Sequence, residues 1–158
     1  MTRVSLLACA ALAACQAGTI EAPASTAEVA GKLELVDAPA TTNIAAYVAP
    51  LVPEAAREHK KLVVYVGATW CEPCRYFHAA AVAGQLDSRL GDLRVLVFDA
   101  DRDADALRAA GYAAPMIPLF ALPAADGQAS GMQIAGSIKG EGAVAQIAPR
   151  LRTLVDAP

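Results

Sequence analysis

Two cysteines in the middle of the chain, Cys71 and Cys74, are separated by only two residues. The residues that follow are typical of a helix, so Cys71 is expected at its N-terminus and Cys74 one turn further in. Free N–H groups and the helix dipole at such an end favour the thiolate, the reactive form of cysteine. Pro73 is tolerated in the first turn of a helix. The spacing predicts a redox dithiol in which one sulfur is exposed and its neighbour resolves the mixed disulfide.

Two other roles for this pair can be weighed from the sequence. A zinc site needs two further ligands, and outside the first fifteen residues the chain offers only His59, His78 and carboxylates. His78 would share a helix with Cys74, which suits a closed tetrahedral site poorly. A purely structural disulfide would close a very small loop, and the entropic gain of a crosslink grows with loop length. A redox role is favoured over both, and no metal is expected.

The elements around the dithiol alternate between apolar strands and amphipathic helices. Leu62–Val66, just before it, is a continuous apolar run typical of a buried parallel strand. Asn43 is a candidate N-cap for a helix over 43–60, which Pro50 and Pro53 must kink or divide. The other expected elements are strands at 32–36, 93–98, 118–122 and 132–138, and helices at 72–90, 103–110 and 141–154. This order predicts one α/β domain with a mixed sheet.

The composition fits a single folded domain with short extensions. Of the 158 residues, 56% are hydrophobic and 18% are charged, so a buried core is expected and bulk disorder is not. The net charge is −3, and the 13 Lys and Arg residues are scattered rather than clustered. This distribution argues against nucleic acid as a partner.

The first fourteen residues are typical of an export signal. A positive start precedes the apolar run Val4–Ala14, which is too short to span a bilayer, since spanning takes roughly twenty residues. The run ends in Leu-Ala-Ala-Cys15, which resembles the lipobox of bacterial lipoproteins; an ordinary cleaved signal is the alternative. The resemblance implies a signal peptide over 1–14, lipid attachment at Cys15, and a periplasm-facing protein of the bacterial cell envelope, in either the outer or the inner membrane. Residues 15–31 are expected to form a flexible tether, and 32–158 the folded domain.

The stretch Val63–Cys74 is an apolar strand followed by Gly-Ala-Thr-Trp-Cys-Glu-Pro-Cys, and it resembles the active-site segment of the thioredoxin superfamily. The resemblance covers about 32–155 and implies a thioredoxin-like fold, with a central mixed sheet flanked by helices on both faces. It also implies that Trp70 shields the pair and contacts partners, while Glu72 and Pro73 complete the active-site loop. Protein thiols and disulfides are the implied substrates. No cofactor is needed, since electrons travel as thiols.

A loop led by a cis-proline lies beside the dithiol in this family. Pro115 and Pro118 are the candidates, and Pro118 is preferred because it opens an expected strand that reaches the turn at 125–127 at the right distance. A cis bond before proline costs only about 0.5–1 kcal/mol over trans. By the resemblance, Ile117 offers its backbone to a bound substrate peptide.

The sequence departs from thioredoxin in the residues that would handle the proton of the inner cysteine. Thioredoxin has a buried Asp on the strand before the dithiol, and Tyr65 stands at the matching position here. His78 is a candidate proton acceptor, with a partly buried packing histidine as the alternative. It would share one helical stripe with residues at i+4 spacing: Cys74, Val82, Leu86 and Leu90.

Glu72 bears on the direction of electron flow. A carboxylate beside Cys71 opposes ionisation of that thiol and favours a reducing potential. The motif is similar to that of extracytoplasmic thiol reductases of cytochrome c maturation, although the glutamate these carry three residues after the second cysteine is Phe77 here. The sequence predicts a reductive envelope thiol:disulfide oxidoreductase with a membrane-bound electron donor. A non-catalytic binding or redox-sensing module is the alternative.

Overall fold

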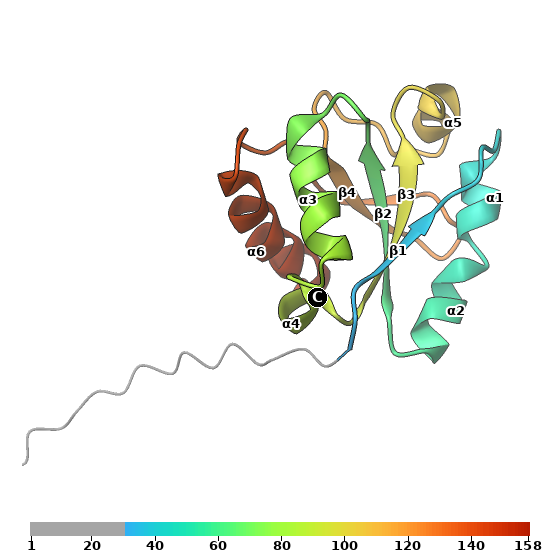
Figure 1. Cartoon of the computed structure of the whole chain (residues 1–158). Helices are drawn as coiled ribbons and strands as arrows, with labels where there is room; N and C mark the ends of the chain where they lie inside the picture. The colour runs from blue at the N-terminus through green and yellow to red at the C-terminus, as the bar shows by residue number, and fades with distance from the viewer. Residues whose placement is uncertain (1–30) are drawn as a thin grey trace, which may run out of the picture.

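The computed structural model describes residues 31–158; the predicted signal peptide, Cys15 and all of the predicted tether before Gly31 lie outside them. Five strands form one sheet in the order β1-β3-β2-β4-β5 (Figure 1). The strands β1, β3 and β2 are parallel, while β4 is antiparallel to β2 and β5 is antiparallel to β4, so the sheet is mixed as predicted. Their bounds are Glu34–Asp37 (β1), Lys61–Gly67 (β2), Leu93–Asp99 (β3), Leu119–Pro123 (β4) and Ala129–Ala135 (β5).

Helices cover both faces of this sheet, which confirms the predicted architecture. The central strand β2 is buried on both sides: Val63 and Tyr65 contribute to one core, and Val64 and Val66 to the other. This alternation follows from the two-residue period of a strand. The first core is closed by α3 (Glu72–Val82), α4 (Asp87–Leu90) and α6 (Gly142–Asp156), and the second by α1 (Ile44–Val48), α2 (Leu51–Arg57) and α5 (Ala104–Ala109).

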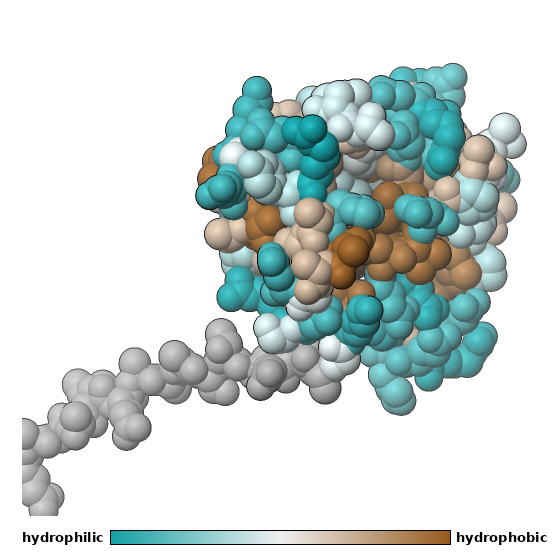
Figure 2. All heavy atoms as spheres, viewed as in Figure 1, coloured by the Kyte–Doolittle hydropathy of each residue, from teal (hydrophilic) through white to brown (hydrophobic). Residues whose placement is uncertain are grey.

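The edge strand β1 is not fully covered by the helices, so hydrophobic side chains next to the two cores reach the surface there. Its side chains Leu35 and Val36 are only partly buried. Figure 2 shows hydrophobic atoms gathered in the middle of this face, between the helices of the two layers. No helix between residue 31 and the C-terminus is long and apolar enough to cross a bilayer.

The division of the first helical segment by proline is confirmed. The Asn43 side chain accepts a hydrogen bond from the Ala46 amide at 3.0 Å and caps α1. The chain then leaves α1 at Val48 and begins α2 after Pro50. Pro53 lies inside the first turn of α2, where a missing N–H breaks no helical hydrogen bond.

The helix predicted over 72–90 is wrong in its length. The structure divides it into α3 and α4, because Gly84 adopts a φ of +72°. The amides of Gly84 and Gln85 donate to the carbonyls of Ala81 and Ala80, which is the Schellman arrangement that ends a helix. Val82 is 67% exposed. The stripe predicted from Cys74 to the residues of α4 is therefore not continuous.

The last strand is also displaced from its predicted range of 132–138. It occupies Ala129–Ala135, and residues 136–141 form a loop before α6. Gly136 turns the chain with a φ of +68°. Arg150 of α6 donates to the carbonyls of Gly136 and Ala135, and Gln146 accepts hydrogen bonds from Ser137 and Ile138. Side chains from α6 therefore satisfy groups that a longer strand would have paired.

Candidate active site

Cys71 and Cys74 are joined by a disulfide at the N-terminus of α3, with their Cα atoms 5.2 Å apart. Cys71 is the N-cap residue, and its sulfur accepts a hydrogen bond from the Cys74 amide at 3.3 Å. Pro73 lies in the first turn, as expected. After reduction, the same amide and the helix dipole are placed to stabilise a thiolate on Cys71.

The exposure of the pair differs from the prediction. Both cysteines are buried in the disulfide form, with Cys71 4% and Cys74 3% exposed. Trp70, immediately before them, is 65% exposed. A partner therefore meets the indole before it meets a sulfur, which agrees with the shielding position expected for Trp70.

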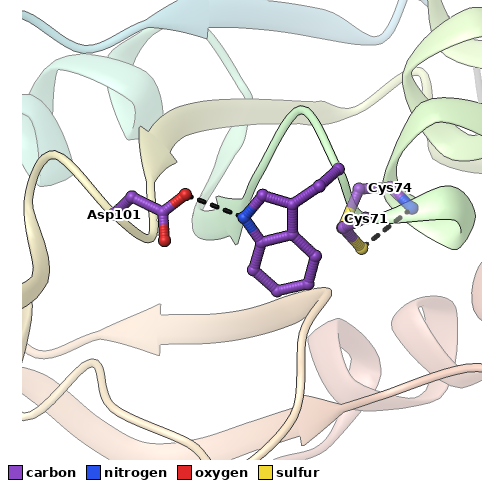
Figure 3. Close-up of a disulfide and its surroundings, with 4 residues drawn as sticks. Cys71, Cys74 and Asp101 are labelled. Carbon is purple, nitrogen blue, oxygen red and sulfur yellow. Dashed lines mark hydrogen bonds between the residues drawn. A yellow bond between two sulfur atoms is a disulfide. The ribbon is translucent and has the colours of Figure 1, made fainter.

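The indole of Trp70 is fixed by Asp101, which no sequence motif marks as a functional residue. Its Nε1 donates a hydrogen bond of 2.8 Å to the carboxylate of Asp101, and Figure 3 draws this bond next to the disulfide. Parallel pairing places Gly67 at the end of β2 level with Asp99 at the end of β3. The loops that follow the two strands therefore begin side by side, and this register was the one available signal for the contact.

The loop after β3 is braced from within by its own carboxylates. Asp99 accepts hydrogen bonds from the amides of Asp101 and Arg102. Asp103, only 3% exposed, accepts from the Asp99 amide and from the Arg102 guanidinium. Asp103 is the N-cap residue of α5, but its side chain makes no capping bond. In the part of the chain described, no three His, Cys, Asp or Glu side chains are arranged to bind a metal.

Glu72 is turned towards another loop. Its carboxylate, part-buried, accepts a hydrogen bond from the Gly140 amide at 3.1 Å. This bond joins the start of α3 to the loop 136–141, which α6 fixes from its other side. No local pattern could predict this contact, because the two residues are 68 positions apart.

The peptide bond between Ile117 and Pro118 is cis, and that before Pro115 is not. Pro118 is buried, and its carbonyl accepts a hydrogen bond from the Gly136 amide at 2.9 Å. The next residue, Leu119, pairs with Val66 across β2 and β4, so the proline lies beside the segment that leads to the dithiol. A mixed sheet of this strand order, a dithiol at the helix after β2 and a cis-proline before β4 occur together in one fold. The chain has a thioredoxin-like fold.

Comparisons with known proteins find distant similarities to solved structures alone. No protein-family model matches the sequence, and no curated protein matches it significantly. Among solved structures, a poplar thioredoxin h is 20% identical, covering 81% of this chain and 100% of its own, with a TM-score of 0.46. Oxidised thioredoxin O1 from Arabidopsis thaliana is 17% identical, covering 80% and 96%, with a TM-score of 0.46. Fasciola hepatica thioredoxin is 23% identical, covering 67% and 92%, with a TM-score of 0.44. The topology and the site geometry, rather than these distant likenesses, identify the fold.

Three large hydrophobic side chains are exposed on the loops of the thioredoxin-like domain that adjoin the site. Trp70 is 65%, Met116 60% and Ile138 50% exposed. They come from the loop before α3, the loop before the cis-proline and the loop that Glu72 binds. The loops next to the dithiol therefore present apolar side chains to solvent, of the kind that protein partners contact.

A cavity of about 570 Å³ opens behind the inner cysteine of the domain. Cys74 and the predicted proton acceptor His78 both line it from α3, although the imidazole of His78 is largely exposed. Tyr65 lines it from β2, in the position where thioredoxin has its buried Asp. Burial raises the pKa of Tyr65 well above its ordinary value, so its hydroxyl stays protonated near neutral pH.

Proposed function

We propose that this protein is a thiol:disulfide oxidoreductase that exchanges electrons with protein partners through Cys71 and Cys74. The observation that supports it most is the disulfide at the start of α3, where the Cys74 amide donates to the Cys71 sulfur. Cys71 is the attacking residue and Cys74 the resolving one, because only the Cys71 sulfur caps the helix.

In the reductive direction, the Cys71 thiolate attacks one sulfur of a partner disulfide. The partner S–S bond breaks, a mixed disulfide forms, and the released partner thiolate takes a proton from solvent. Cys74 then loses its proton and attacks the Cys71 sulfur, which reforms the Cys71–Cys74 disulfide and releases the second partner thiol. Two electrons pass from the dithiol to the partner, and no cofactor is required.

Proteins with an extended segment around their cysteine are the proposed substrates. The exposed side chains of Trp70, Met116 and Ile138, on loops that adjoin the dithiol, offer apolar contacts to such a segment. Ile117, beside the cis bond, is proposed to pair with the substrate backbone. The charged residues are scattered, which gives no support for nucleic acid as a partner.

A reductive direction is supported by Glu72, whose negative charge adjoins Cys71 and disfavours the thiolate. Continuous turnover would then need an upstream dithiol that reduces the Cys71–Cys74 disulfide. We propose a membrane-bound electron donor for this step, in keeping with the envelope location that the sequence suggests.

Membrane attachment through a lipid on Cys15 is proposed from the lipobox-like sequence alone. The test is labelling of producing cells with a fatty-acid analogue, for the natural chain and for Cys15→Ala. Label in the natural chain that Cys15→Ala removes supports attachment at Cys15. Absence of label in the natural chain, or label that persists in the variant, rules it out.

The activity is tested by insulin reduction with a small dithiol as electron source. We expect turnover by the natural protein, none by Cys71→Ser, and stable mixed disulfides with partners in Cys74→Ser, because the resolving sulfur is missing. Equal rates in the natural protein and Cys71→Ser would overturn the proposal. The partners trapped by Cys74→Ser would identify the pathway.

A non-catalytic binding or redox-sensing module is the second candidate, and the burial of both sulfurs favours it. Equilibration with glutathione buffers separates the two candidates. A Cys71–Cys74 bond that reduces reversibly in step with insulin turnover supports the enzyme. A bond that resists reduction while the folded protein still binds partners supports the module.

A further inference from the structure

Tyr65 is fixed at the end of β2 nearest to the dithiol. Its ring packs against Phe120 and Phe77, with centroid distances of 4.9 and 5.6 Å. The ring extends along the strand towards Gly67: a Cβ atom built on this glycine would lie only 2.5 Å from the Tyr65 hydroxyl oxygen. The rings of Phe77 and Phe120, together with the absence of a side chain at Gly67, therefore determine where the Tyr65 hydroxyl lies.

The hydroxyl shares the cavity with the inner cysteine. Tyr65, Gly67 and Cys74 all line the same space of about 570 Å³. The Tyr65 hydroxyl forms no hydrogen bond within residues 31–158, where no side-chain oxygen or nitrogen is both fully buried and unpartnered. The hydroxyl is therefore reached by solvent, and the cavity that Tyr65 lines is where solvent can reach it. A cavity of this size, lined in part by charged side chains such as Asp99 and Arg102, accommodates water molecules that bridge protein groups.

We propose that Tyr65 is a positioning residue for the resolving step, whose hydroxyl donates a hydrogen bond to the sulfur of Cys74, directly or through one cavity water. This inference rests on the proposed oxidoreductase function. In the mixed disulfide, the Cys74 thiol passes its proton to cavity water, and its electron pair attacks the Cys71 sulfur. The bond from Cys71 to the partner breaks, and the partner leaves as a thiolate that is protonated by solvent.

A neutral donor stabilises the thiolate without accepting its proton, so Tyr65 differs in kind from a buried carboxylate base. Burial keeps the Tyr65 hydroxyl protonated. Charged and titratable groups also line the cavity from every element around it: Asp37 at the end of β1, Asp99 at the end of β3, Arg102 in the loop that follows, and Arg75 and His78 on α3. The carboxylates oppose a thiolate at Cys74 and the guanidinium groups favour it, so their effects partly cancel.

The test measures the thiolate of Cys74 directly, in full-length Cys71→Ser, where it is the one thiol of the dithiol that remains. Cys9 and Cys15 are also replaced by serine, so that Cys74 is the one thiol left in the chain. The ultraviolet absorbance of the protein, measured against pH, then gives the fraction of Cys74 in the thiolate form without any turnover. Addition of Tyr65→Phe is expected to lower that fraction about tenfold at a given pH, as loss of a hydrogen bond to a charged sulfur predicts. Tyr47→Phe, in α1 on the opposite face of the sheet, is the matched control and should change nothing.

Further variants separate the explanations. Gly67→Ala displaces the hydroxyl without removing it and should lower the thiolate fraction in the same direction. An unchanged titration in Tyr65→Phe overturns the inference, and so does a shift seen in His78→Ala but not in Tyr65→Phe, which would make His78 the acting group. Failure of the natural protein to reduce insulin, with a normal Tyr65→Phe effect on Cys74, would overturn the proposed function and leave the placement of Tyr65 standing.

Discussion

Replacement of Gly67 by alanine tests whether Tyr65 is locked in position. The new methyl carbon would lie 2.5 Å from the Tyr65 hydroxyl oxygen and 2.8 Å from the ring carbon Cζ. The ring cannot swing aside freely, because Phe77 and Phe120 pack against it. Forcing an extra methyl group into a packed site costs about 1–3 kcal/mol. We expect Gly67→Ala to lower the free energy of unfolding by this amount.

A double-mutant cycle with Tyr65→Phe shows whether the cost comes from this contact. Phenylalanine removes the oxygen at 2.5 Å but leaves the ring carbon at 2.8 Å, so Gly67→Ala should cost roughly half as much in that background, a coupling on the order of 1 kcal/mol. Urea unfolding of the oxidised protein, followed by circular dichroism, measures all four variants. Equal costs of Gly67→Ala in both backgrounds would refute the reasoning, because the clash would then lie elsewhere.

Three further predictions concern charged and titratable groups. Asp103→Ala should lower the free energy of unfolding by about 1–3 kcal/mol, because it removes a buried carboxylate and leaves the part-buried Asp99 amide unpaired; a change in urea unfolding no larger than that of Asp103→Asn would contradict this. Glu72→Ala should raise the KM for insulin about two- to tenfold, because the hydrogen bond from Glu72 to the loop 136–141 is lost. Glu72→Gln keeps an acceptor for this bond and should leave the KM unchanged. Equal effects of the two variants in steady-state kinetics would make the charge of Glu72, not the hydrogen bond, responsible. Burial raises the pKa of both Tyr65 and Tyr112. Their contribution to the free energy of unfolding should therefore be constant up to about pH 10, where tyrosines of the unfolded chain ionise, and fall above it. Urea midpoints that stay level from pH 9 to 11 would show that neither ring resists ionisation.

The features that could be predicted from the sequence depend on local chemistry. Local patterns predict the structure of the few residues around them: the spacing of Cys71 and Cys74, the apolar run of β2 and the N-cap at Asn43. A proline inside a helix divides or kinks it whatever surrounds it, so Pro50 was enough to predict the break between α1 and α2. The choice of Pro118 over Pro115 needed only the strand that begins directly after Pro118. The end of α3 is also determined locally, by the positive φ of Gly84. The apolar pattern nevertheless predicted one helix that continued to residue 90.

The features that could not be predicted depend on residues distant in sequence. The true end of β5 is determined by Arg150 and Gln146 of α6, which compete for the backbone groups of the loop. The bond from Trp70 to Asp101 spans 31 positions and requires the register of β2 against β3. The burial of Cys71 depends on tertiary packing, and nothing in the local sequence distinguishes it from an exposed cysteine.

Both ends of the folded part lie on one side of the molecule, and the dithiol lies on the other. Gly31 rests against Gly91, just before β3 begins, and Lys61 at the start of β2 forms an ion pair with Asp156 at the end of α6. The dithiol follows the far end of β2, a strand of seven residues that spans about 20 Å. A surface, tag or carrier joined to either terminus would therefore leave the reactive sulfurs pointing outwards, and immobilised protein should stay open to large partners.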